Sequence, residues 1–215
     1  MAKKIFITAT NTDIGKTYTT KKLLKHFASQ GFRVGVIKPI ETGVVDNHYL
    51  DGEQLLQLIQ TLNPLFLEKT VQDIVPIAFT LPAAPYIASS GSFIDISLIE
   101  KKIQELEMIC DILLIEGAGG LYVPINEDFM MIDLIKHLDV PALLVTHCSL
   151  GCINDTLLSS NALTQHHIKH LVAFNCKQKD EDFATLSLPY FQKTSYPIVK
   201  VDADIDKICN ILKNF

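Results

Sequence analysis

Arginine is almost absent from this sequence. Arg33 is the only arginine among 19 basic residues, and 24 acidic residues leave the 215-residue chain with a net charge of -5. Proteins that bind nucleic acids usually carry a basic excess and use arginine to contact phosphates and guanines. The composition therefore argues against nucleic-acid binding, and it excludes a site built from several arginines.

Long apolar segments are also lacking. No stretch approaches the roughly 20 apolar residues that a membrane helix needs. The charged start of the chain leads into an apolar run, residues 5–7, that is too short for a secretory signal. We therefore expect a protein that is not inserted in a membrane.

The cysteines lack the CxxC spacing of redox and zinc motifs. Their number is odd and they are scattered: Cys110, Cys148, Cys152, Cys176 and Cys209. Such a set is typical of reduced, mostly buried thiols in a reducing compartment. We expect free thiols and a cytoplasmic protein.

Short apolar runs alternate with helical patterns along the chain. Strands are expected at 4–8, 33–37, 112–115, 142–145 and 171–174. Helices are expected between them, at 17–29, 129–138 and 153–163 among others. Strands that are apolar on both faces and separated by amphipathic helices predict a parallel sheet covered on both sides. The expected fold class is α/β, with residues 1–215 forming a single doubly wound domain whose sheet is mainly parallel.

Two segments leave alternatives open. Residues 44–92 are irregular and contain several prolines, which fits either a linker or an ordered insertion near a site; their apolar content favours the insertion. Residues 205–215 have the apolar spacing of an amphipathic helix. Such a helix can bind membranes, but its polar face is not especially basic, so we expect it to pack on its own domain.

The strongest chemical signal is residues 8–17, between the first strand and the first helix. In a phosphate-binding loop, backbone N–H groups and the following helix N-terminus surround a polyphosphate. Here Gly15 allows close approach, Lys16 reaches the β- and γ-phosphates, and the Thr17 hydroxyl ligates Mg²⁺. The common pattern GxxxxGK[ST] has glycine where this chain has Thr10. A chance Gly-Lys-Thr turn is the alternative, which the position between strand and helix makes less attractive.

Further polar residues follow other predicted strands. Glu116 ends a buried strand and precedes the small residues 117–120, an arrangement that fits a Mg²⁺ ligand better than an ordinary surface turn. Lys38 ends the second strand, with Thr42 nearby, and strand C-termini converge on the ligand crevice of a doubly wound sheet. Asp51 fits either a helix N-cap or a further Mg²⁺ ligand.

The segment 150–156 opens a helix whose N–H groups suit a carboxylate. We interpret Cys152 as a small apolar residue and not as a nucleophile, because no histidine is placed by sequence to activate it. His147 with Cys148 and Cys152 is weak evidence for a metal. Three further histidines are expected to be solvated at the surface: His166, His167 and His170.

Together these segments resemble the dethiobiotin synthetase family of P-loop enzymes. The landmarks follow in family order over nearly the whole chain: residues 10–17, 38–39, 116–120 and 150–154. The family's loop is one residue longer than the common pattern, which accounts for Thr10, and it has glycine where this chain has Ala9. Ala84 stands where a hydroxyl residue is common, and Phe183 falls near a family tyrosine that completes base recognition.

The resemblance implies an ATP- and Mg²⁺-dependent ligase of biotin biosynthesis. One amine of 7,8-diaminopelargonate takes up CO₂ as a carbamate, which attacks the γ-phosphate to give a carbamic-phosphoric anhydride. The second amine then closes the ring, leaving dethiobiotin, ADP and phosphate. This chemistry needs neutralised phosphoryl charge and strict positioning, but no nucleophilic side chain.

The resemblance also implies roles for individual residues. Lys38 and Thr42 would hold the carbamate and the transferring phosphoryl group, and Lys38 and Lys16 would be catalytic. The metal ligands would be Thr17, Asp51 and Glu116. The nucleotide would bind Thr12, Asp13, Ile14, Gly15, Lys16, Thr17, Glu116, Gly119 and Asn175. The partner subunit of a homodimer would bind the substrate carboxylate through Gly151, Cys152, Ile153 and Asn154.

Two rival functions remain. A regulatory ATPase of the MinD/ParA type would share the fold and use its terminal helix at membranes, but such proteins normally carry a second lysine early in the loop, where this chain has Thr10 and Asn11. A small-molecule kinase would release a stable phosphorylated product instead of free phosphate.

Overall fold

The central element is a five-stranded parallel sheet. The computed structural model describes residues 2–176 and 180–215, and within them the strand order is β2-β5-β1-β8-β9. The strands are β1 (Lys3–Ala9), β2 (Val34–Ile37), β5 (Ile112–Gly120), β8 (Ala142–His147) and β9 (His170–Asn175). They are buried on both faces, as their continuous apolar runs require. All five expected strands are confirmed, and so is the α/β class.

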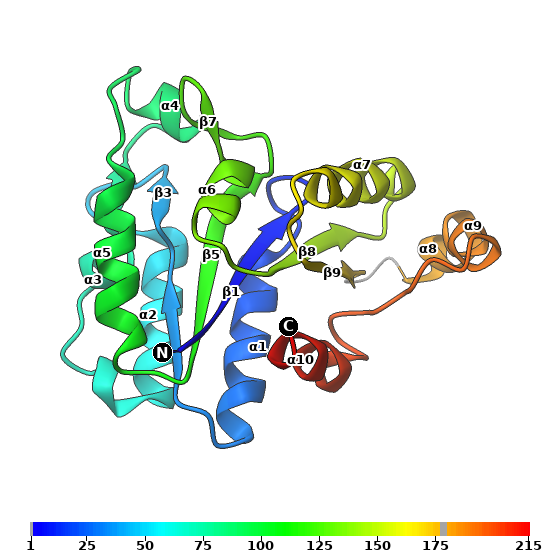
Figure 1. Ribbon diagram of the computed structural model, residues 1–215, viewed down its shortest axis with the longest axis horizontal. Helices are drawn as coiled ribbons and strands as arrows, with labels where there is room; N and C mark the ends of the chain where they lie inside the picture. Colours follow the sequence, from blue (N-terminus) through cyan, green and yellow to red (C-terminus); the bar gives the residue numbers. More distant parts are fainter. Residues whose placement is uncertain (1, 177–179) are drawn as a thin grey trace.

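Helices cover both faces of this sheet (Figure 1). On one face α1 (Lys16–Ser29) contacts both α2 (Leu50–Leu62) and α10 (Ile205–Lys213). The other face is covered by α5 (Ile96–Glu107), α6 (Met131–His137) and α7 (Cys152–Gln165). The expected helix at 129–138 is shorter than predicted, because residues 129–130 form strand β7 instead.

Smaller elements lie between and beyond the main strands and helices. Two short sheets pair β3 (Ile40–Thr42) with β4 (Ile77–Phe79), and β6 (Pro124–Asn126) with β7 (Phe129–Met130). The short helices are a 3₁₀ turn (Pro64–Phe66), α3 (Val71–Ile74), α4 (Pro85–Ala88), α8 (Asp180–Leu186) and α9 (Leu188–Lys193). Residues 44–92 therefore form an ordered insertion, as expected, and not a linker.

The terminal helix packs on the domain. Ile208, Cys209 and Leu212 of α10 are fully buried, and α10 contacts α1 and β9. This confirms the expected intramolecular packing of the C-terminal segment. No helix in the described part of the chain is both long and apolar enough to cross a bilayer.

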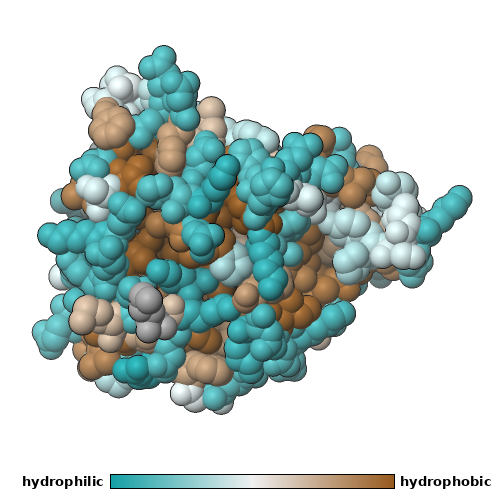
Figure 2. All heavy atoms as spheres, viewed as in Figure 1, coloured by the Kyte–Doolittle hydropathy of each residue, from teal (hydrophilic) through white to brown (hydrophobic). Residues whose placement is uncertain are grey.

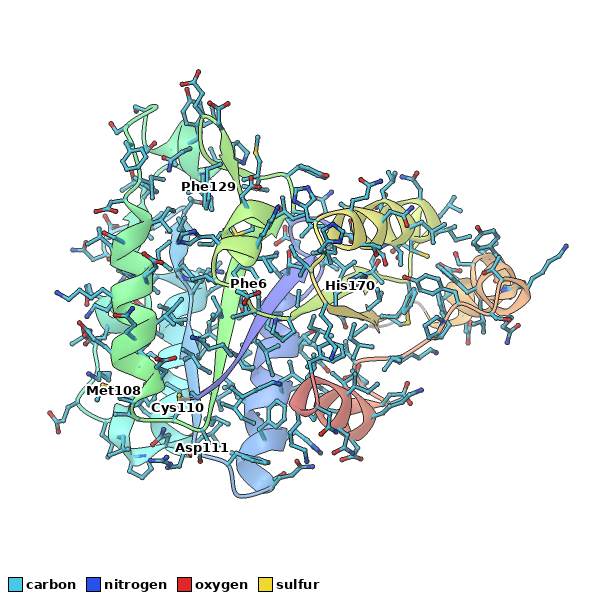
Figure 3. All side chains as sticks on the ribbon, in the orientation of Figure 1. Phe6, Met108, Cys110, Asp111, Phe129 and His170 are labelled. Atoms are coloured by element: carbon cyan, nitrogen blue, oxygen red, sulfur yellow. A yellow bond between two sulfur atoms is a disulfide. The ribbon has the colours of Figure 1, made fainter. Side chains whose placement is uncertain are left out.

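Apolar and polar side chains separate between the interior and the surface. Phe6 lies buried in the centre of the sheet, whereas Met108 is exposed beyond the end of α5 (Figure 3). On the face shown in Figure 2, brown apolar patches lie within a mainly hydrophilic surface. Arg33 forms an ion pair with Asp111, 2.6 Å from Nη2 to Oδ1, at the amino ends of β2 and β5. The one arginine therefore lies at the opposite edge of the sheet from the strand C-termini.

The expectation of five reduced thiols is wrong for two of them. Cys148 and Cys176 form a disulfide, whereas Cys110, Cys152 and Cys209 are free and buried. The pair is far apart in sequence but follows directly after β8 and β9, whose last residues His147 and Asn175 lie side by side. The adjacency of these strands brings the two sulfurs together.

The histidines after α7 are only partly solvated. His167 is exposed, but His170 is half-buried, with Nε2 2.9 Å from Ser160 Oγ and Nδ1 3.0 Å from the Ile168 carbonyl oxygen. The expectation that all three are surface residues is therefore wrong for His170, whose ring is held by two neighbours.

Candidate active site

The phosphate-binding loop lies between β1 and α1, as predicted. Gly15 adopts φ 99°, a left-handed conformation that favours glycine, and it directly precedes α1. No side chain caps the N-terminus of α1, so its first N–H groups remain suited to an anion. The local backbone therefore has the glycine conformation and the uncapped helix N-terminus that an anion-binding loop requires.

Lys16 folds back over this loop. Its Nζ lies 3.4 Å from the backbone oxygen of Asn11, and the residue is largely buried. Burial lowers the pKa of Lys16, and the positive charge of Lys38 lowers it further. The charges of Glu116, Asp51 and Asp13 oppose this lowering but do not cancel it, so an anionic ligand would further stabilise the charged form of Lys16.

Glu116 is the centre of a polar network in the middle of β5. The expectation that the strand ends just before Glu116 is wrong, because β5 continues through residues 117–120. It is fully buried and accepts hydrogen bonds from Thr17 Oγ1 at 2.7 Å and from Thr20 Oγ1 at 2.6 Å. Lys38 Nζ lies 3.1 Å from the same carboxylate. Thr20 was missed by the sequence analysis, although it lies one helical turn after Lys16 and therefore on the same face of α1.

Lys38 is held between two carboxylates. Its Nζ lies 2.7 Å from Asp51 Oδ2 as well as 3.1 Å from Glu116 Oε1, and its side chain is 5% exposed. Burial opposes the charge, but Glu116 and Asp51 outweigh burial and raise the pKa of Lys38. Lys38 is consequently a permanent cation at the end of β2.

Asp51 is not the N-cap of its helix, because Tyr49 occupies that position and α2 begins at Leu50. Its carboxylate instead faces Lys38. Burial opposes ionisation of Asp51, but the charge and hydrogen bond of Lys38 lower the pKa of this carboxyl below its ordinary value. The sequence allowed two roles for Asp51, and the helix N-cap is wrong. The Asp51 carboxylate lies beside Thr17 and Glu116, and its role as a Mg²⁺ ligand stays a prediction.

The side chain that accepts the free N–H groups at the start of α2 belongs to Glu41, which lies in β3. The sequence had not indicated Glu41 as a site residue. Its two carboxylate oxygens accept the backbone N–H groups of Asp51 at 2.8 Å and Gly52 at 2.9 Å. Burial raises the pKa of Glu41, and these two donors oppose that shift. Because these hydrogen bonds tie the first turn of α2 to β3, Glu41 fixes the position of Asp51 relative to Lys38.

We expect Glu41→Ala to destabilise the protein by about 1–2 kcal/mol, the typical cost of losing a helix cap, and to lower any activity that requires Asp51. Glu41→Gln keeps one carbonyl oxygen as an acceptor and should therefore lose less stability and less activity than Glu41→Ala. Urea unfolding and steady-state rates of the two variants would test this. Equal behaviour of Glu41→Ala and the parent protein would contradict the assigned role.

These groups surround a cavity of about 500 Å³. It is lined by several of the predicted residues: Thr12, Asp13, Gly15, Lys16, Thr17, Lys38, Thr42, Asp51 and Gly119. Glu116 lies beneath them, bonded to Thr17 and Lys38. Residues from four separate segments of the chain are thus brought to one edge of the sheet. We call this the phosphate cavity.

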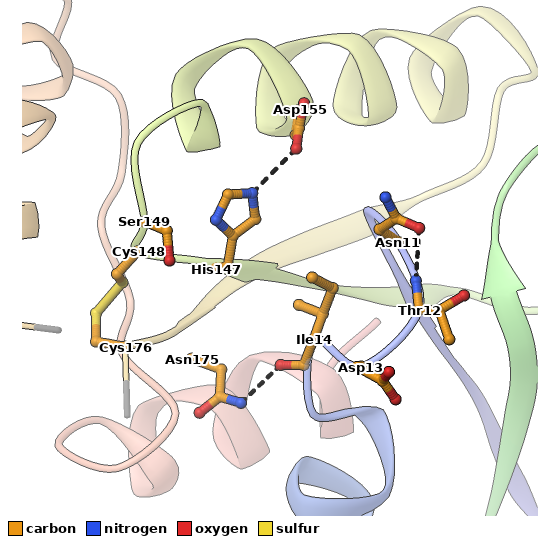
Figure 4. Close-up of a pocket in the computed structure, with 10 residues that line it drawn as sticks. All are labelled: Asn11, Thr12, Asp13, Ile14, His147, Cys148, Ser149, Asp155, Asn175 and Cys176. Atoms are coloured by element: carbon orange, nitrogen blue, oxygen red, sulfur yellow. Dashed lines mark hydrogen bonds and ion pairs between the residues drawn. A yellow bond between two sulfur atoms is a disulfide. The ribbon is translucent and has the colours of Figure 1, made fainter. Parts of the chain in front are cut away.

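A second cavity of about 610 Å³ lies on the other side of the loop (Figure 4). Residues 11–14 of the loop form one wall. The other wall is formed by residues at the ends of β8 and β9, the residues just after them, and Asp155 of α7. The two cavities therefore lie on either side of one loop, and Thr12 and Asp13 belong to the walls of both. We call this the base cavity.

Asn175 lies in the base cavity with a defined orientation. Its Nδ2 donates to the carbonyl oxygen of Ile14 at 2.7 Å, and because a carbonyl can only accept, the side-chain oxygen must face the other way (Figure 4). That Oδ1 is buried, and no group in the described residues donates to it. A buried acceptor without a donor is costly unless a ligand supplies one.

The segment 151–154 is not brought to the phosphate cavity. Gly151 adopts φ 97° and precedes α7, whose N-terminus has no side-chain cap, but none of Gly151, Cys152, Ile153 and Asn154 lines that cavity. Leu150 beside them is 80% exposed. His147 pairs with Asp155 at 3.0 Å and Cys148 is in the disulfide, so these side chains already have partners other than a metal.

Two of the three departures from the family pattern, Ala84 and Phe183, have defined places in the structure. Ala84 is the N-cap of α4 and has no side-chain hydrogen bond there. Phe183 packs against Phe174 and Phe191, with ring centroids 5.2 and 6.2 Å away, and does not line the base cavity. In this structure the Phe183 ring is buried in an aromatic cluster, and its correspondence to a family tyrosine stays a prediction.

Solved structures share the fold at low sequence identity. A plasmid partition protein from Borrelia burgdorferi matches with a TM-score of 0.59 and 12% identity, covering 100% of this chain and 97% of that chain. A GTPase in apo form from Pyrococcus abyssi matches with a TM-score of 0.56 and 12% identity, covering 99% and 96%. These likenesses establish the P-loop α/β fold.

Sequence relatives define the family. Residues 3–210 match a family model described as an AAA domain. An ATP-dependent dethiobiotin synthetase from a Sulfurovum species is 48% identical over 87% of this chain and 89% of its own length. The corresponding protein of Wolinella succinogenes is 33% identical over 98% of both chains. With the loop, the two lysines and the buried glutamate in place, this chain belongs to the ATP-dependent dethiobiotin synthetase family.

Proposed function

We propose that the protein forms dethiobiotin from 7,8-diaminopelargonate, CO₂ and ATP, with release of ADP and phosphate. The observation that carries this proposal is the placement of Lys38. Its buried ammonium, held by Asp51 and Glu116, lines the same cavity as the helix N-terminus and Lys16. Such an arrangement stabilises negative charge that moves between a phosphoryl group and an adjacent anion.

The nucleotide is proposed to lie across both cavities. Its phosphates bind the N-terminus of α1 and Lys16, and its base lies beside Asn175. The Asn175 oxygen that has no donor among the described residues accepts an N–H, which a base with an exocyclic amine supplies. This supports ATP over a nucleotide whose base presents a carbonyl oxygen at that position.

The oxygen ligands fit Mg²⁺. The Thr17 hydroxyl and the carboxylates of Asp51 and Glu116 lie around the phosphate cavity, and Mg²⁺ in such sites takes one or two carboxylates together with phosphate oxygens. When bound, the ion neutralises charge on the phosphates. We propose these three residues as its ligands, directly or through water.

The chain's own residues supply positioning and charge, not a covalent partner. Lys38, with Thr42 on the same cavity wall, orients the carbamate toward the γ-phosphate and compensates its charge. The anhydride that forms is held in place while the second amine attacks and phosphate leaves. Neither a cysteine nor a histidine lines the described phosphate cavity, in keeping with a reaction between substrates alone.

The substrate carboxylate needs a contact that the phosphate cavity does not provide. We propose that Gly151, Cys152, Ile153 and Asn154 of a second copy bind it, so that the working form is a cytoplasmic homodimer. Leu150 is 80% exposed beside this segment, and burying an apolar side chain of this kind favours association.

The test is phosphate release from ATP with Mg²⁺ and bicarbonate, measured with and without 7,8-diaminopelargonate. Diamine-dependent release of free phosphate, with dethiobiotin detected as the product, supports the ligase. Release that ignores the diamine favours a regulatory ATPase of the MinD/ParA type. Accumulation of a stable phosphorylated diamine favours a kinase.

Replacing Asn175 with leucine should raise the KM for ATP about three- to tenfold, as expected for one lost hydrogen bond, with little change in kcat. Discrimination between ATP and GTP should shrink by a similar factor. Parallel measurement of both nucleotides checks this, since a general folding defect would lower kcat for both. An unchanged ratio of the two KM values would remove Asn175 from base recognition.

A further inference from the structure

The disulfide lies in the wall of the base cavity. Cys148 and Cys176 both line it, and each directly follows the last residue of its strand (Figure 4). Those last residues, His147 and Asn175, are paired in register across β8 and β9. The covalent link therefore joins the two strand ends that form one side of the cavity.

The disulfide restrains the backbone next to Asn175, because Asn175 directly precedes Cys176 in the chain. The Asn175 side chain is held at its other end by the Ile14 carbonyl of the phosphate-binding loop. A disulfide keeps two sulfurs within bonding distance, whereas two thiols cannot approach so closely. Reduction removes this covalent restraint from the strand end that carries Asn175.

We propose that Cys148 and Cys176 are a reversible dithiol–disulfide site that sets the affinity of the base cavity for ATP, with the disulfide form binding more tightly. The inference rests on the proposed binding of the ATP base beside Asn175. In the disulfide form Oδ1 of Asn175 is already held where it can accept a hydrogen bond from the base. Binding of ATP then costs less conformational entropy at this strand end.

The chemistry is thiol–disulfide exchange with a small disulfide such as glutathione disulfide. One cysteine thiolate attacks the small disulfide, forming a mixed disulfide and releasing one thiol. The second cysteine thiolate attacks the protein sulfur of that mixed disulfide and releases the second thiol. The two cysteines lose two electrons and two protons, which appear on the two released thiols. In a reducing compartment such pairs are usually transient and redox-sensing.

Other cysteines do not compete for this role. Cys110, Cys152 and Cys209 are buried and line neither cavity. The thiol of Cys110 donates to the Leu106 carbonyl, a contact that serine can reproduce. Cys110→Ser is therefore a matched control for Cys148→Ser and Cys176→Ser.

The experiment compares the protein equilibrated with glutathione disulfide and with excess glutathione. Thiol titration after unfolding should find three free thiols in the first sample and five in the second. Calorimetry should show ATP binding about three- to tenfold more tightly in the oxidised sample. Inorganic triphosphate, which has no base, should bind both samples alike. The double variant Cys148→Ser with Cys176→Ser, which can form neither the disulfide nor a mixed disulfide at this site, should bind ATP alike under both conditions, and Cys110→Ser should respond as the parent protein does.

The outcomes separate the redox site from the proposed function. Five titratable thiols after oxidation, or ATP binding that is equal in the two samples, overturns the redox site and leaves the ligase standing. A redox effect of the same size on inorganic triphosphate also overturns it, because the effect would not act through the base. Failure of ATP to bind either sample overturns the proposed nucleotide site and the redox inference together.

Discussion

Replacing Lys38 with alanine is expected to lower diamine-dependent phosphate release by about 10²–10³-fold, the usual cost of removing one preorganised group that stabilises transition-state charge. The ammonium lies 2.7 Å from Asp51 and 3.1 Å from Glu116, and it lines the cavity in which the phosphoryl group moves. Steady-state phosphate release and dethiobiotin formation measure the loss. Lys25→Ala, on the exposed side of α1, should leave both unchanged.

The same change should also destabilise the fold. Removing Lys38 leaves Glu116 fully buried without its cation, and breaking a buried pair in this way costs about 3–5 kcal/mol. The double variant Lys38→Met with Glu116→Gln removes both charges and should recover most of that stability without recovering activity. If the double variant were active, the charge of Lys38 would have no part in the reaction.

Much of the site was predictable because a parallel sheet gathers its strand ends. Lys38 and Glu116 each follow the apolar run of a predicted strand, and strands of that kind place their C-termini at one edge whatever the order between them. Lys16 and Thr17 belong to a local motif, which needs no long-range information. For these residues, the positions of the predicted strands were sufficient to predict that the side chains lie close together.

Other residues depend on contacts that sequence spacing does not encode. Glu41 caps α2 from outside that helix, so its role appears only once the helix lies against β3. Cys148 and Cys176 are 28 positions apart and meet because β8 and β9 are neighbours in the sheet. Phe183 depends likewise on where the segment after β9 packs. Strand order and helix docking, not composition, decide each of these cases.

Charge on Lys16 is expected to control nucleotide affinity in the alkaline range. Burial and the charge of Lys38 lower the pKa of Lys16 below its ordinary value of 10.5. Because polyphosphate binds the protonated amine, ATP affinity should fall as pH rises through this lowered pKa. The same interactions that hold Lys38 raise its pKa, so Lys38 keeps its charge while Lys16 loses it.

Lys16→Met keeps an unbranched side chain of similar bulk and removes the charge. We expect it to lower phosphate release by about 10²–10³-fold and to weaken ATP binding at neutral pH. Its ATP affinity should then no longer decline at alkaline pH, because the group that titrates is gone. Calorimetric titrations of both proteins from pH 7 to pH 10 measure this. A parallel alkaline decline in Lys16→Met would assign the titration to another group, and an unchanged affinity at neutral pH would remove Lys16 from the phosphate site.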